Sequence, residues 1–378
     1  MKILVTGGAG FIGSWLVDFL LDAGHSVVVI DNLSSQIHGS RPNITAPWIL
    51  EDKPVSFIRE DIRNRDALEQ ALSGVDAVVH LAAETGTGQS MYQIARYNDV
   101  NQQATATLLE LISGKCRSVK KLILASSRSI YGEGAYRLGD QIIVPSPRSA
   151  AEMQRGNFDP TGPRKEKITA IATPEDIPPA PASIYASTKL FNEISGKIIS
   201  EICDCQVIAL RFQNVYGERQ SLQNPYTGLI SIFSNRMRQG LPINIFEDGQ
   251  ESRDFVHVSD VVRAIVLALN ANSKKWLVVN VGSGVAVSVY EVAKKLKDLL
   301  RSKSTLNITG DFRLGDIRHC YADLSRARHV LKFSPNILLP EGLERFAKWV
   351  VTQPIFEDKT IATLNQMRQL GLARFPSK

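Results

Sequence analysis

A glycine-rich loop constrains the fold of this chain more than any other feature of its sequence. The loop, Gly7–Gly13, reads GGAGFIG; it follows the apolar run Lys2–Thr6 and opens a helix-like stretch. Its glycines allow a tight turn, a close approach of the backbone to a ligand and close packing of helix on strand, and the helix N-terminus favours a pyrophosphate. Such a pattern alone is weak evidence, because any tight strand–helix turn can use glycine. The strand before it and the helix after it support a dinucleotide site, contacted by Gly7, Gly10, Phe11, Ile12 and Gly13.

An acid at the end of the next strand indicates which dinucleotide binds. Asp31 directly follows the apolar run Ser26–Ile30. A carboxylate at this position accepts hydrogen bonds from the adenosine ribose hydroxyls and repels a 2′-phosphate, so we expect NAD rather than NADP. A helix cap or turn residue is the competing interpretation of Asp31. The other residues expected at the cofactor are Asn32, Asp61, Ile62, Leu81, Ala82, Ala83 and Asn101.

Short apolar runs alternate with helix-like segments through the first 212 residues. The runs are Lys2–Thr6, Ser26–Ile30, Val55–Ile58, Ala77–Leu81, Lys121–Ser126 and Gln206–Phe212, and the helices are Gly13–Ala23, Asp66–Leu72, Asn101–Gly114 and one from near Ser183. Strands alternating with helices imply right-handed crossovers, so the predicted fold is α/β with a doubly wound, Rossmann-type parallel sheet.

The less regular second half predicts a smaller α/β domain interleaved with the sheet. Its expected elements are helices at 227–239, 258–270 and 288–301 and strands at 243–246 and 278–281. We therefore expect a cofactor domain over 1–212 with parts of 255–282, a substrate domain over 213–254 and 283–350, and a peripheral helical tail over 351–378.

Residues 144–181 interrupt this pattern. They hold eight of the seventeen prolines and show no apolar period. Too little apolar surface is available for a domain, so the segment is interpreted as an ordered loop or flap, with a disordered linker as the alternative. Its basic residues suit a cover over an anionic substrate: Arg148, Arg155, Arg164, Lys165 and Lys167.

A tyrosine and a lysine four residues apart indicate proton-transfer chemistry. Tyr185 and Lys189 share one face of a predicted helix. Tyrosine has a pKa near 10 and is a poor base at neutral pH, but a nearby cation lowers that pKa. Ser127, at the end of a predicted strand, can hydrogen-bond the same substrate oxygen. An isolated Tyr-x-x-x-Lys is usually a surface pair; here the dinucleotide fold and the order of the residues favour a catalytic site.

These features occur among motifs that resemble the extended short-chain dehydrogenase/reductases acting on nucleotide sugars. The likeness covers roughly residues 1–350, through TGGAGFIG, Asp31-Asn32, Asp61-Ile62-Arg63, HLAA, ASSRSIYGEG, YASTK, RFQNVYG, SRDFVHVSD and FRLGD in that order. The resemblance is strongest to the hexose 4-epimerases. It implies that Tyr185 removes the 4-hydroxyl proton while NAD⁺ takes the C4 hydride, and that the hydride returns to the other face of a 4-keto sugar. Tyr185 and Lys189 then also contact the cofactor.

Two alternatives to epimerisation stay open. The 4,6-dehydratases of this family place Asp-Glu directly after the serine, where this chain has Arg128 and Ser129. Arginine cannot serve as an acid and serine is a poor base, so dehydration is disfavoured. A non-catalytic NAD-binding sensor is the second alternative, although such proteins lose the tyrosine or the lysine. Arg128 itself either pairs with an acid of the insertion or contacts the substrate.

The resemblance also implies a nucleotide-sugar subsite. It assigns Asn214 to the diphosphate, Arg253 and Arg313 to the phosphates, Asp316 to the ribose, and Phe246 to the base, while Ser127 faces the sugar. Surface salt bridges or a core ring would explain the same residues, above all a pair between Arg253 and Asp254. The RFQNVYGERQ stretch and the long Ser127–Tyr185 spacing resemble a sub-branch that includes dTDP-L-rhamnose 4-epimerases. The insertion lacks the cysteines found in that sub-branch, so no metal is expected, and the substrate is a dTDP- or UDP-hexose.

Composition indicates which binding partners and which cellular compartment to expect. The net charge of +6 is mild and the basic residues are scattered, so no nucleic acid is expected. No apolar stretch reaches the roughly 18 residues of a membrane span, and the early glycine loop leaves no room for a signal peptide. Four cysteines without a zinc or disulfide spacing favour a reducing, cytoplasmic setting. By resemblance, a homodimer through helices 101–114 and 183–202 is expected.

Overall fold

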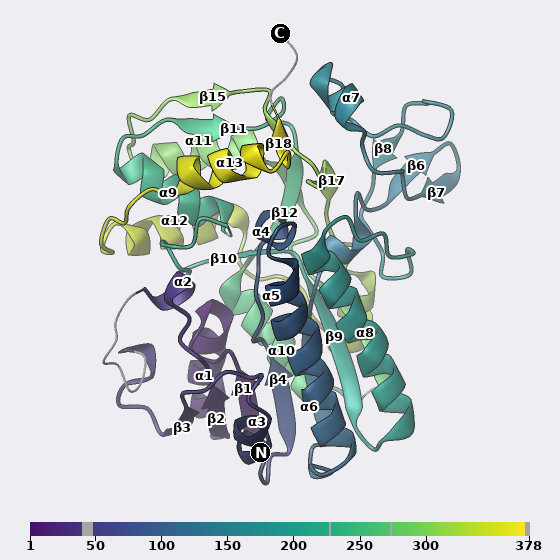
Figure 1. Ribbon diagram of the computed structural model, residues 1–378, viewed down its shortest axis with the longest axis vertical. Helices are drawn as coiled ribbons and strands as arrows, with labels where there is room; N and C mark the ends of the chain where they lie inside the picture. Colours follow the sequence, from purple (N-terminus) through teal and green to yellow (C-terminus); the bar gives the residue numbers. More distant parts are fainter. Residues whose placement is uncertain (40–47, 227, 273, 375–378) are drawn as a thin grey trace.

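A seven-stranded parallel sheet forms the centre of the computed structural model, which describes residues 1–39, 48–226, 228–272 and 274–374 (Figure 1). In spatial order its strands are β13 (Trp276–Val281), β9 (Gln206–Phe212), β5 (Lys121–Ser127), β4 (Ala77–His80), β1 (Lys2–Thr6), β2 (Ser26–Ile30) and β3 (Val55–Ile58). The chain winds outward from β1 to β3 and then returns to β4 on the other side of β1. The expected doubly wound sheet is confirmed, and ligands of such sheets bind where the winding reverses.

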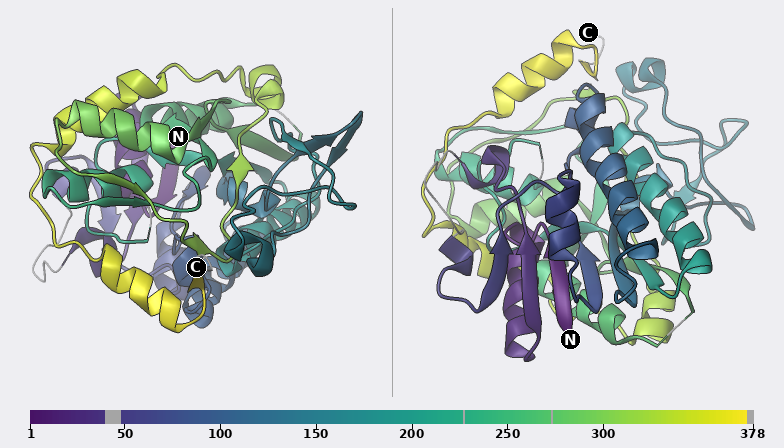
Figure 2. Two further views of the ribbon diagram at one scale, coloured as in Figure 1. Left: turned by 90° about the horizontal axis from the view of Figure 1, so that it is seen from above. Right: turned by 60° about the horizontal axis from the view of Figure 1, so that its bottom comes forward.

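Helices cover both faces of the sheet (Figures 1 and 2). One face carries α1 (Phe11–Asp22) and α10 (Val258–Asn270), and the other carries α3 (Arg65–Ala71), α6 (Ala104–Ser113) and α8 (Ile184–Ile202). Short helical segments lie in the connections: α2 (Ser35–His38), η1 (Trp48–Leu50), α4 (Thr87–Ser90), α5 (Ile94–Asn98), η2 (Asp99–Gln103), η3 (Arg128–Tyr131) and η4 (Ala327–Leu331).

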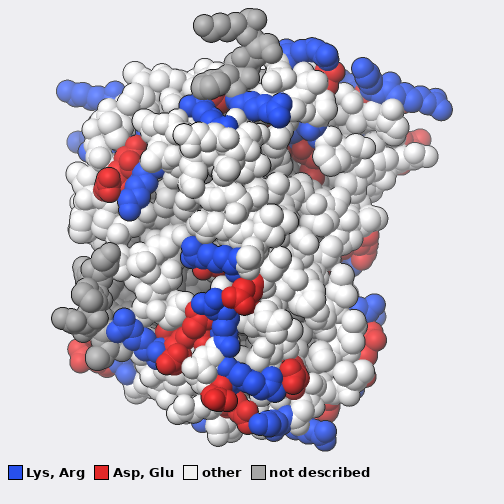
Figure 3. All heavy atoms as spheres, in the orientation of Figure 1, with Lys and Arg blue, Asp and Glu red and all other residues white. Residues whose placement is uncertain are grey.

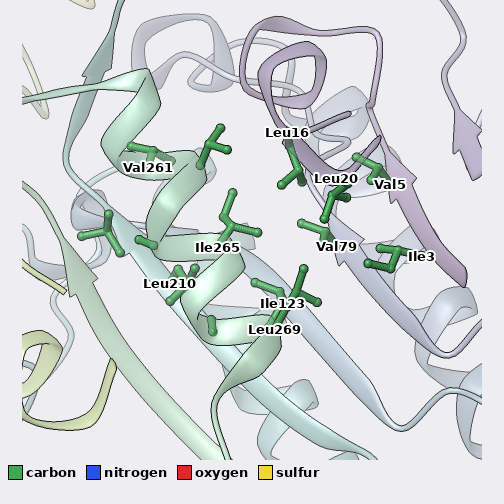
Figure 4. Packing of buried hydrophobic residues seen from close by; sticks show 14 of the residues in the cluster. Ile3, Val5, Leu16, Leu20, Val79, Ile123, Leu210, Val261, Ile265 and Leu269 are labelled. Carbon is green, nitrogen blue, oxygen red and sulfur yellow. The ribbon is translucent and has the colours of Figure 1, made fainter. Parts of the chain in front are cut away.

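The strands are apolar on both sides because each side meets a helical layer. Along β1, Ile3 and Val5 belong to one core cluster, and Leu4 belongs to the other. This alternation is the two-residue period of a strand. Figure 4 shows the first cluster, in which α1 and α10 pack over the sheet through Leu16, Leu20, Val261, Ile265 and Leu269.

A third core cluster lies under the elements of the second half of the chain. These are β10 (Asn214–Tyr216), α9 (Leu229–Arg238), β11 (Ile243–Ile245), β12 (Ser252–His257), β14 (Ala286–Ser288), α11 (Val289–Leu299), β15 (Leu306–Ile308), β16 (Phe312–Arg313), β17 (His319–Cys320) and α12 (Leu339–Val350). Thr227, the first residue of the helix expected at 227–239, lies outside the described residues. Between β12 and β14 the chain returns to the large sheet through α10 and β13, so the two halves are interleaved.

The insertion is ordered and pairs with the chain just before it. Strands β6 (Tyr136–Leu138) and β7 (Gln141–Ile143), which precede residue 144, pair antiparallel with each other, and β8 (Thr169–Ala170) of the insertion pairs antiparallel with β6. Helix α7 (Ala150–Gln154) lies between β7 and β8 in the sequence. Ser149 caps α7 by accepting a hydrogen bond from the Glu152 backbone N–H. In Figure 1 this part stands to the upper right of the molecule.

Part of the tail expected at 351–378 is helical, and two of its segments contact the rest of the fold; residues 375–378 lie outside the described residues. Its helix α13 (Thr360–Gln369) places a buried Met367 against Gly88 of α4. The following β18 (Ala373–Arg374) pairs antiparallel with β16, the strand that carries Arg313. The pairing joins segments sixty residues apart, so no local sequence signal announces it.

Three further properties of the described structure concern membrane-spanning helices, cysteines and surface charge. Within the described ranges, no helix combines the length and apolarity needed to cross a membrane. The thiols of Cys116, Cys203, Cys205 and Cys320 are free. On the face drawn in Figure 3, basic side chains lie beside acidic ones rather than in a continuous basic area.

Candidate active site

A cleft of about 530 Å³ opens at the carboxyl ends of the strands, between the large sheet and the second half of the chain. Every residue expected at the cofactor or the substrate lines this cleft except Asn101. Predictions made from motifs more than 300 residues apart therefore meet in one place, at the reversal of the sheet.

The glycine loop packs so closely on neighbouring backbone that a side chain at Gly7 or Gly13 would clash with it. Gly7 has a φ of +68°, and a Cβ built on it would lie 2.8 Å from the backbone nitrogen of Ala82. A Cβ on Gly13 would lie 2.3 Å from the carbonyl oxygen of Gly7. Gly10 caps α1 without a side-chain hydrogen bond, and the first turn carries no acid. The positive helix end therefore faces the cleft and suits a pyrophosphate.

Asp31 is held beside this loop by the backbone. Its carboxylate accepts hydrogen bonds from the N–H groups of Ala9 (3.1 Å) and Leu33 (2.9 Å), and His38 Nε2 lies 4.0 Å away. Burial raises the pKa of Asp31, and the two backbone hydrogen bonds and His38 act against that rise. The carboxylate is thus pre-positioned between the glycine loop and the rim of the cleft, as an acceptor for ribose hydroxyls requires.

Replacing Asp31 with asparagine should weaken the preference for NAD over NADP at least about tenfold. The amide can keep an acceptor near Ala9 and Leu33 but carries no charge to repel a 2′-phosphate. The check is the ratio of NADP to NAD dissociation constants for the two proteins. A wild-type protein purified with bound NADP would show that the argument is wrong.

A second carboxylate, Asp61, organises another part of the cleft lining. Asp61 accepts hydrogen bonds from Asn32 Nδ2 (2.9 Å) and from Arg63 Nε and Nη2 (2.9 and 3.0 Å). Burial disfavours the charged form of Asp61, but the hydrogen bonds from Arg63 and Asn32 outweigh it and bring its pKa down to about 2. Asp61 therefore stays ionised and fixes the position of Asn32.

Ser127, Tyr185 and Lys189 come together as the sequence indicates. Ser127 ends β5, while Tyr185 and Lys189 lie in successive turns at the start of α8, which Ser183 caps. The Ser127 side chain hydrogen-bonds Tyr185. Lys189 Nζ donates to the carbonyl oxygen of Ala125 (2.8 Å) and lies 5.8 Å from the centre of the Tyr185 ring.

Burial dominates the electrostatics of this group. It raises the pKa of Tyr185, and the Ser127 side chain and the charge of Arg128 act against this rise. Lys189 is itself buried, and its own pKa falls to about 8 for that reason. Arg128, which the sequence alone left unassigned, therefore joins Ser127 in favouring the phenolate form of Tyr185.

Asn101 lies behind the cleft and not in its lining. It is 1% exposed, donates to the Glu84 carbonyl oxygen (3.0 Å) and to Thr188 Oγ1 (3.1 Å), and accepts from the Glu84 N–H (2.8 Å). These bonds tie the segment after β4 to helix α8. Its place within the π-helical turn η2 explains the inward orientation.

Arg253 stands at the substrate side without an acidic partner. Its Nη1 donates to the backbone carbonyls of Ser252 and Arg318 (2.8 and 3.0 Å), and it forms no ion pair within the described part of the chain. Asp254 instead accepts from Ser283, Gly284 and Ala322, so the competing Arg253–Asp254 pair does not form. Burial lowers the pKa of Arg253 to about 10. An anionic ligand would compensate this buried charge.

The remaining predicted substrate residues also lie in the second half of the chain and line the same cleft. Arg313 lies over the Phe246 ring, 5.0 Å from its centre, and its Nε donates to Asp316 (2.7 Å). Asn214 Oδ1 is buried without a partner among the described residues. Pattern reasoning missed Glu251, which is 8% exposed, lines the cleft and has an unpartnered Oε2. Burial raises the pKa of Glu251 to about 7.

The insertion does not cover this cleft. None of residues 144–181, all of which the structure describes, lines it. Arg148, expected to face an anionic substrate, instead pairs with Glu133 and Glu247 inside the protein. Arg155 pairs with Glu152 on the surface. The flap interpretation is therefore not supported.

Comparison with known proteins identifies the family of this chain. The family described as the NAD dependent epimerase/dehydratase family matches residues 3–282. A dTDP-L-rhamnose 4-epimerase of Burkholderia thailandensis is 36% identical over 356 residues, covering 93% of this chain and 95% of the relative. The chain belongs to the NAD dependent epimerase/dehydratase family. It is an enzyme fold with an NAD site, as expected from the glycine loop and Asp31.

Solved structures are similar to this chain over nearly its whole length. A UDP-glucose 4-epimerase of Thermotoga maritima, crystallised with UDP-glucose, is 30% identical with a TM-score of 0.75, covering 93% of this chain and 99% of the other. A UDP-glucuronic acid 4-epimerase of Bacillus cereus, in complex with UDP-glucuronic acid and NAD, is 29% identical with a TM-score of 0.75 and the same coverage.

Proposed function

We propose that this protein is an NAD-dependent 4-epimerase of nucleoside-diphosphate hexoses, with dTDP-L-rhamnose as the first substrate to test. The observation that carries the proposal is the meeting of Ser127, Tyr185 and Lys189 in one cleft with Arg253 and the glycine loop. The relative that acts on dTDP-L-rhamnose aligns over 95% of its length, which supports that substrate. A cytoplasmic location is part of the proposal; the free thiols of the four cysteines support it, because a reducing compartment keeps thiols reduced.

The residues divide the reaction between them. Tyr185, in its phenolate form, takes the proton of the 4-hydroxyl as the C4–H bond breaks, and Ser127 hydrogen-bonds the same oxygen. The glycine loop and Asp31 would hold NAD⁺, which would supply the acceptor for the C4 hydride and the donor for its return to the other face of the sugar. Tyr185 then gives its proton back to the new hydroxyl. Arg253 holds the diphosphate throughout, so that the hexosyl group can turn over while the substrate stays bound.

Dehydration lacks its acid and base in this site. The two residues after Ser127 are Arg128 and Ser129, and both belong to the short helix η3. Arg128 cannot donate a proton at any working pH, and the Ser129 hydroxyl is buried without a partner in the described structure. Loss of water across C5 and C6 therefore has no catalyst at the place where dehydratases of this family carry one.

The test is incubation of the enzyme with a panel of dTDP- and UDP-hexoses that includes dTDP-L-rhamnose, followed by NMR of the products. We expect inversion at C4, an unchanged C6 and no solvent deuterium at C5. A 4-keto-6-deoxy product would identify a dehydratase instead. A protein that binds NAD and turns over none of the panel would support the sensor alternative.

A homodimer is also part of the proposal. Helix α8 exposes Ile194, Ile198 and Ile202, at 54%, 53% and 70%, with a spacing of four residues along one stripe. Helices α6 and α8 lie side by side on the same face of the sheet (Figures 1 and 2). An exposed apolar stripe of this kind marks an interaction site, and a second copy of α6 and α8 would cover it.

Replacing Ile198 with aspartate should convert the dimer to a monomer. The interface would bury the aspartate carboxylate without a charged partner, and the cost of its desolvation would oppose association. Light scattering on a size-exclusion column measures the mass. Ile142→Asp is the matched control, since Ile142 on β7 is 54% exposed but lies outside the stripe. A wild-type monomer, or two variants with the same mass as wild type, would contradict the proposal.

A further inference from the structure

Arg128 has no acidic partner in the part of the chain that the structure describes. Its Nη1 is buried and makes no hydrogen bond. A pair with an acid of the insertion was one of its two interpretations, but those acids are engaged elsewhere. Asp159 binds Arg318, Glu152 binds Arg155, Asp176 binds Arg326, Glu166 accepts from the Arg164 N–H, and Glu175 accepts from the Asn280 N–H.

The guanidinium of Arg128 faces the cleft beside the catalytic group. Arg128 directly follows Ser127 and lines the same cleft as Tyr185 and Arg253. Cys320 lies beside it, close enough for the charge of Arg128 to act against the rise that burial causes in the pKa of that thiol. The same charge acts against the rise in the pKa of Tyr185 and adds to the lowering of the pKa of Arg253 that burial causes, so Arg128 lies within electrostatic range of both.

An unpartnered guanidinium in a buried cleft indicates a missing acceptor. Guanidinium has five N–H donors and no acceptor, and a buried donor left without a partner is costly. A second cation of this cleft, Arg253, donates to backbone carbonyls but has no acidic partner among the described residues. Arg253 lies on β12, which pairs with β10, the strand that begins at Asn214, and this position suits the diphosphate. Arg128 lies in η3, directly after Ser127, which places it at the sugar.

We propose that Arg128 binds the substrate directly, with Nη1 donating to an oxygen of the hexosyl group near the reacting carbon. The inference rests on the proposed function and adds a residue to it. A contact at this point holds the sugar at a second oxygen, beside the oxygen shared by Ser127 and Tyr185. The side chain therefore discriminates between sugars that carry an acceptor there and sugars that do not.

The test compares Arg128→Met and Arg128→Lys with wild type, once wild-type epimerisation has been measured. The measurements are kcat and KM for the nucleotide sugar, the inhibition constant of the free nucleoside diphosphate, and the bound NAD. For Arg128→Met we expect a loss in kcat/KM of about 10–100-fold, the effect of one hydrogen bond from a charged group. Inhibition by the nucleoside diphosphate should change less than about threefold, and Arg128→Lys should recover part of the loss.

Cys320→Ala is the matched control, because Cys320 lies beside Arg128 but does not line the cleft. We expect its kcat/KM to stay within about threefold of wild type. Equal losses in kcat/KM and in nucleoside diphosphate binding would assign Arg128 to the diphosphate and overturn the proposal. Unchanged kinetics in Arg128→Met, or an equal loss in Cys320→Ala, would also overturn it. An inactive wild type bears on the proposed function alone.

Discussion

Replacing Tyr185 with phenylalanine should lower turnover by about 10²–10⁴-fold, the usual range for the loss of a general acid or base. The phenylalanine ring keeps the edge contact with Tyr97, whose ring centre lies 6.5 Å away. It removes only the hydroxyl that Ser127 hydrogen-bonds. NAD should remain bound at the wild-type level, because the glycine loop and Asp31 are unchanged. Steady-state kinetics and the absorbance of bound cofactor measure the two quantities.

Tyr136→Phe is the control for this experiment. Tyr136 is also buried, and its hydroxyl has no partner among the described residues, but it lies in β6 outside the cleft. Its loss should leave turnover within about twofold of wild type. Near-normal turnover in Tyr185→Phe would exclude the mechanism, whatever the product.

Local patterns were enough to place the cofactor and catalytic residues. The glycine loop requires particular backbone conformations, and Asp31 and Ser127 each mark the end of an apolar strand. A parallel sheet brings all such strand ends to one edge, so these residues meet without any knowledge of long-range contacts. Tyr185 and Lys189 meet for a similarly local reason, the four-residue spacing of a helix.

The hydrogen-bond and ion-pair partners of individual side chains, and the burial of those side chains, could not be predicted from local patterns. Arg128 became a candidate only when each nearby acid was seen to bind another residue. The desolvation of Lys189, which lowers its own pKa to about 8, depends on how α8 packs on β5. Asn101 turned inward because of a π-helical turn. The tail joined the fold through β18 and β16, which lie far apart in the sequence. These outcomes depend on tertiary packing, which local propensity does not encode.

The insertion was misinterpreted for the same reason. Composition described Arg148 as one of five basic residues near an anionic substrate. In the structure its side chain is 4% exposed. It donates to Glu133 (2.8 Å), which lies 15 residues away in the sequence, and to Glu247 (2.7 Å), which lies 99 residues away. It also donates to the carbonyl oxygens of Phe158 (3.0 Å) and Asp316 (2.7 Å). Arg148 thus connects the insertion to the substrate wall of the cleft.

Replacing Arg148 with methionine should lower the free energy of unfolding by about 3–5 kcal/mol, the usual cost of breaking a buried ion pair from one side. Glu133 and Glu247 keep Arg318 as a partner, but each loses a charged donor and neither can reach water. Urea denaturation measures the change.

Arg155→Met is the matched control in the same insertion, because the side chains of its pair, Arg155 and Glu152, are 65% and 40% exposed, and this pair should contribute less than about 0.5 kcal/mol. Adding Glu247→Gln to Arg148→Met should cost less than the sum of the two single changes, since the second carboxylate no longer has that pair to lose. Equal effects of Arg148→Met and Arg155→Met would show that the insertion is attached to the fold by something other than this network.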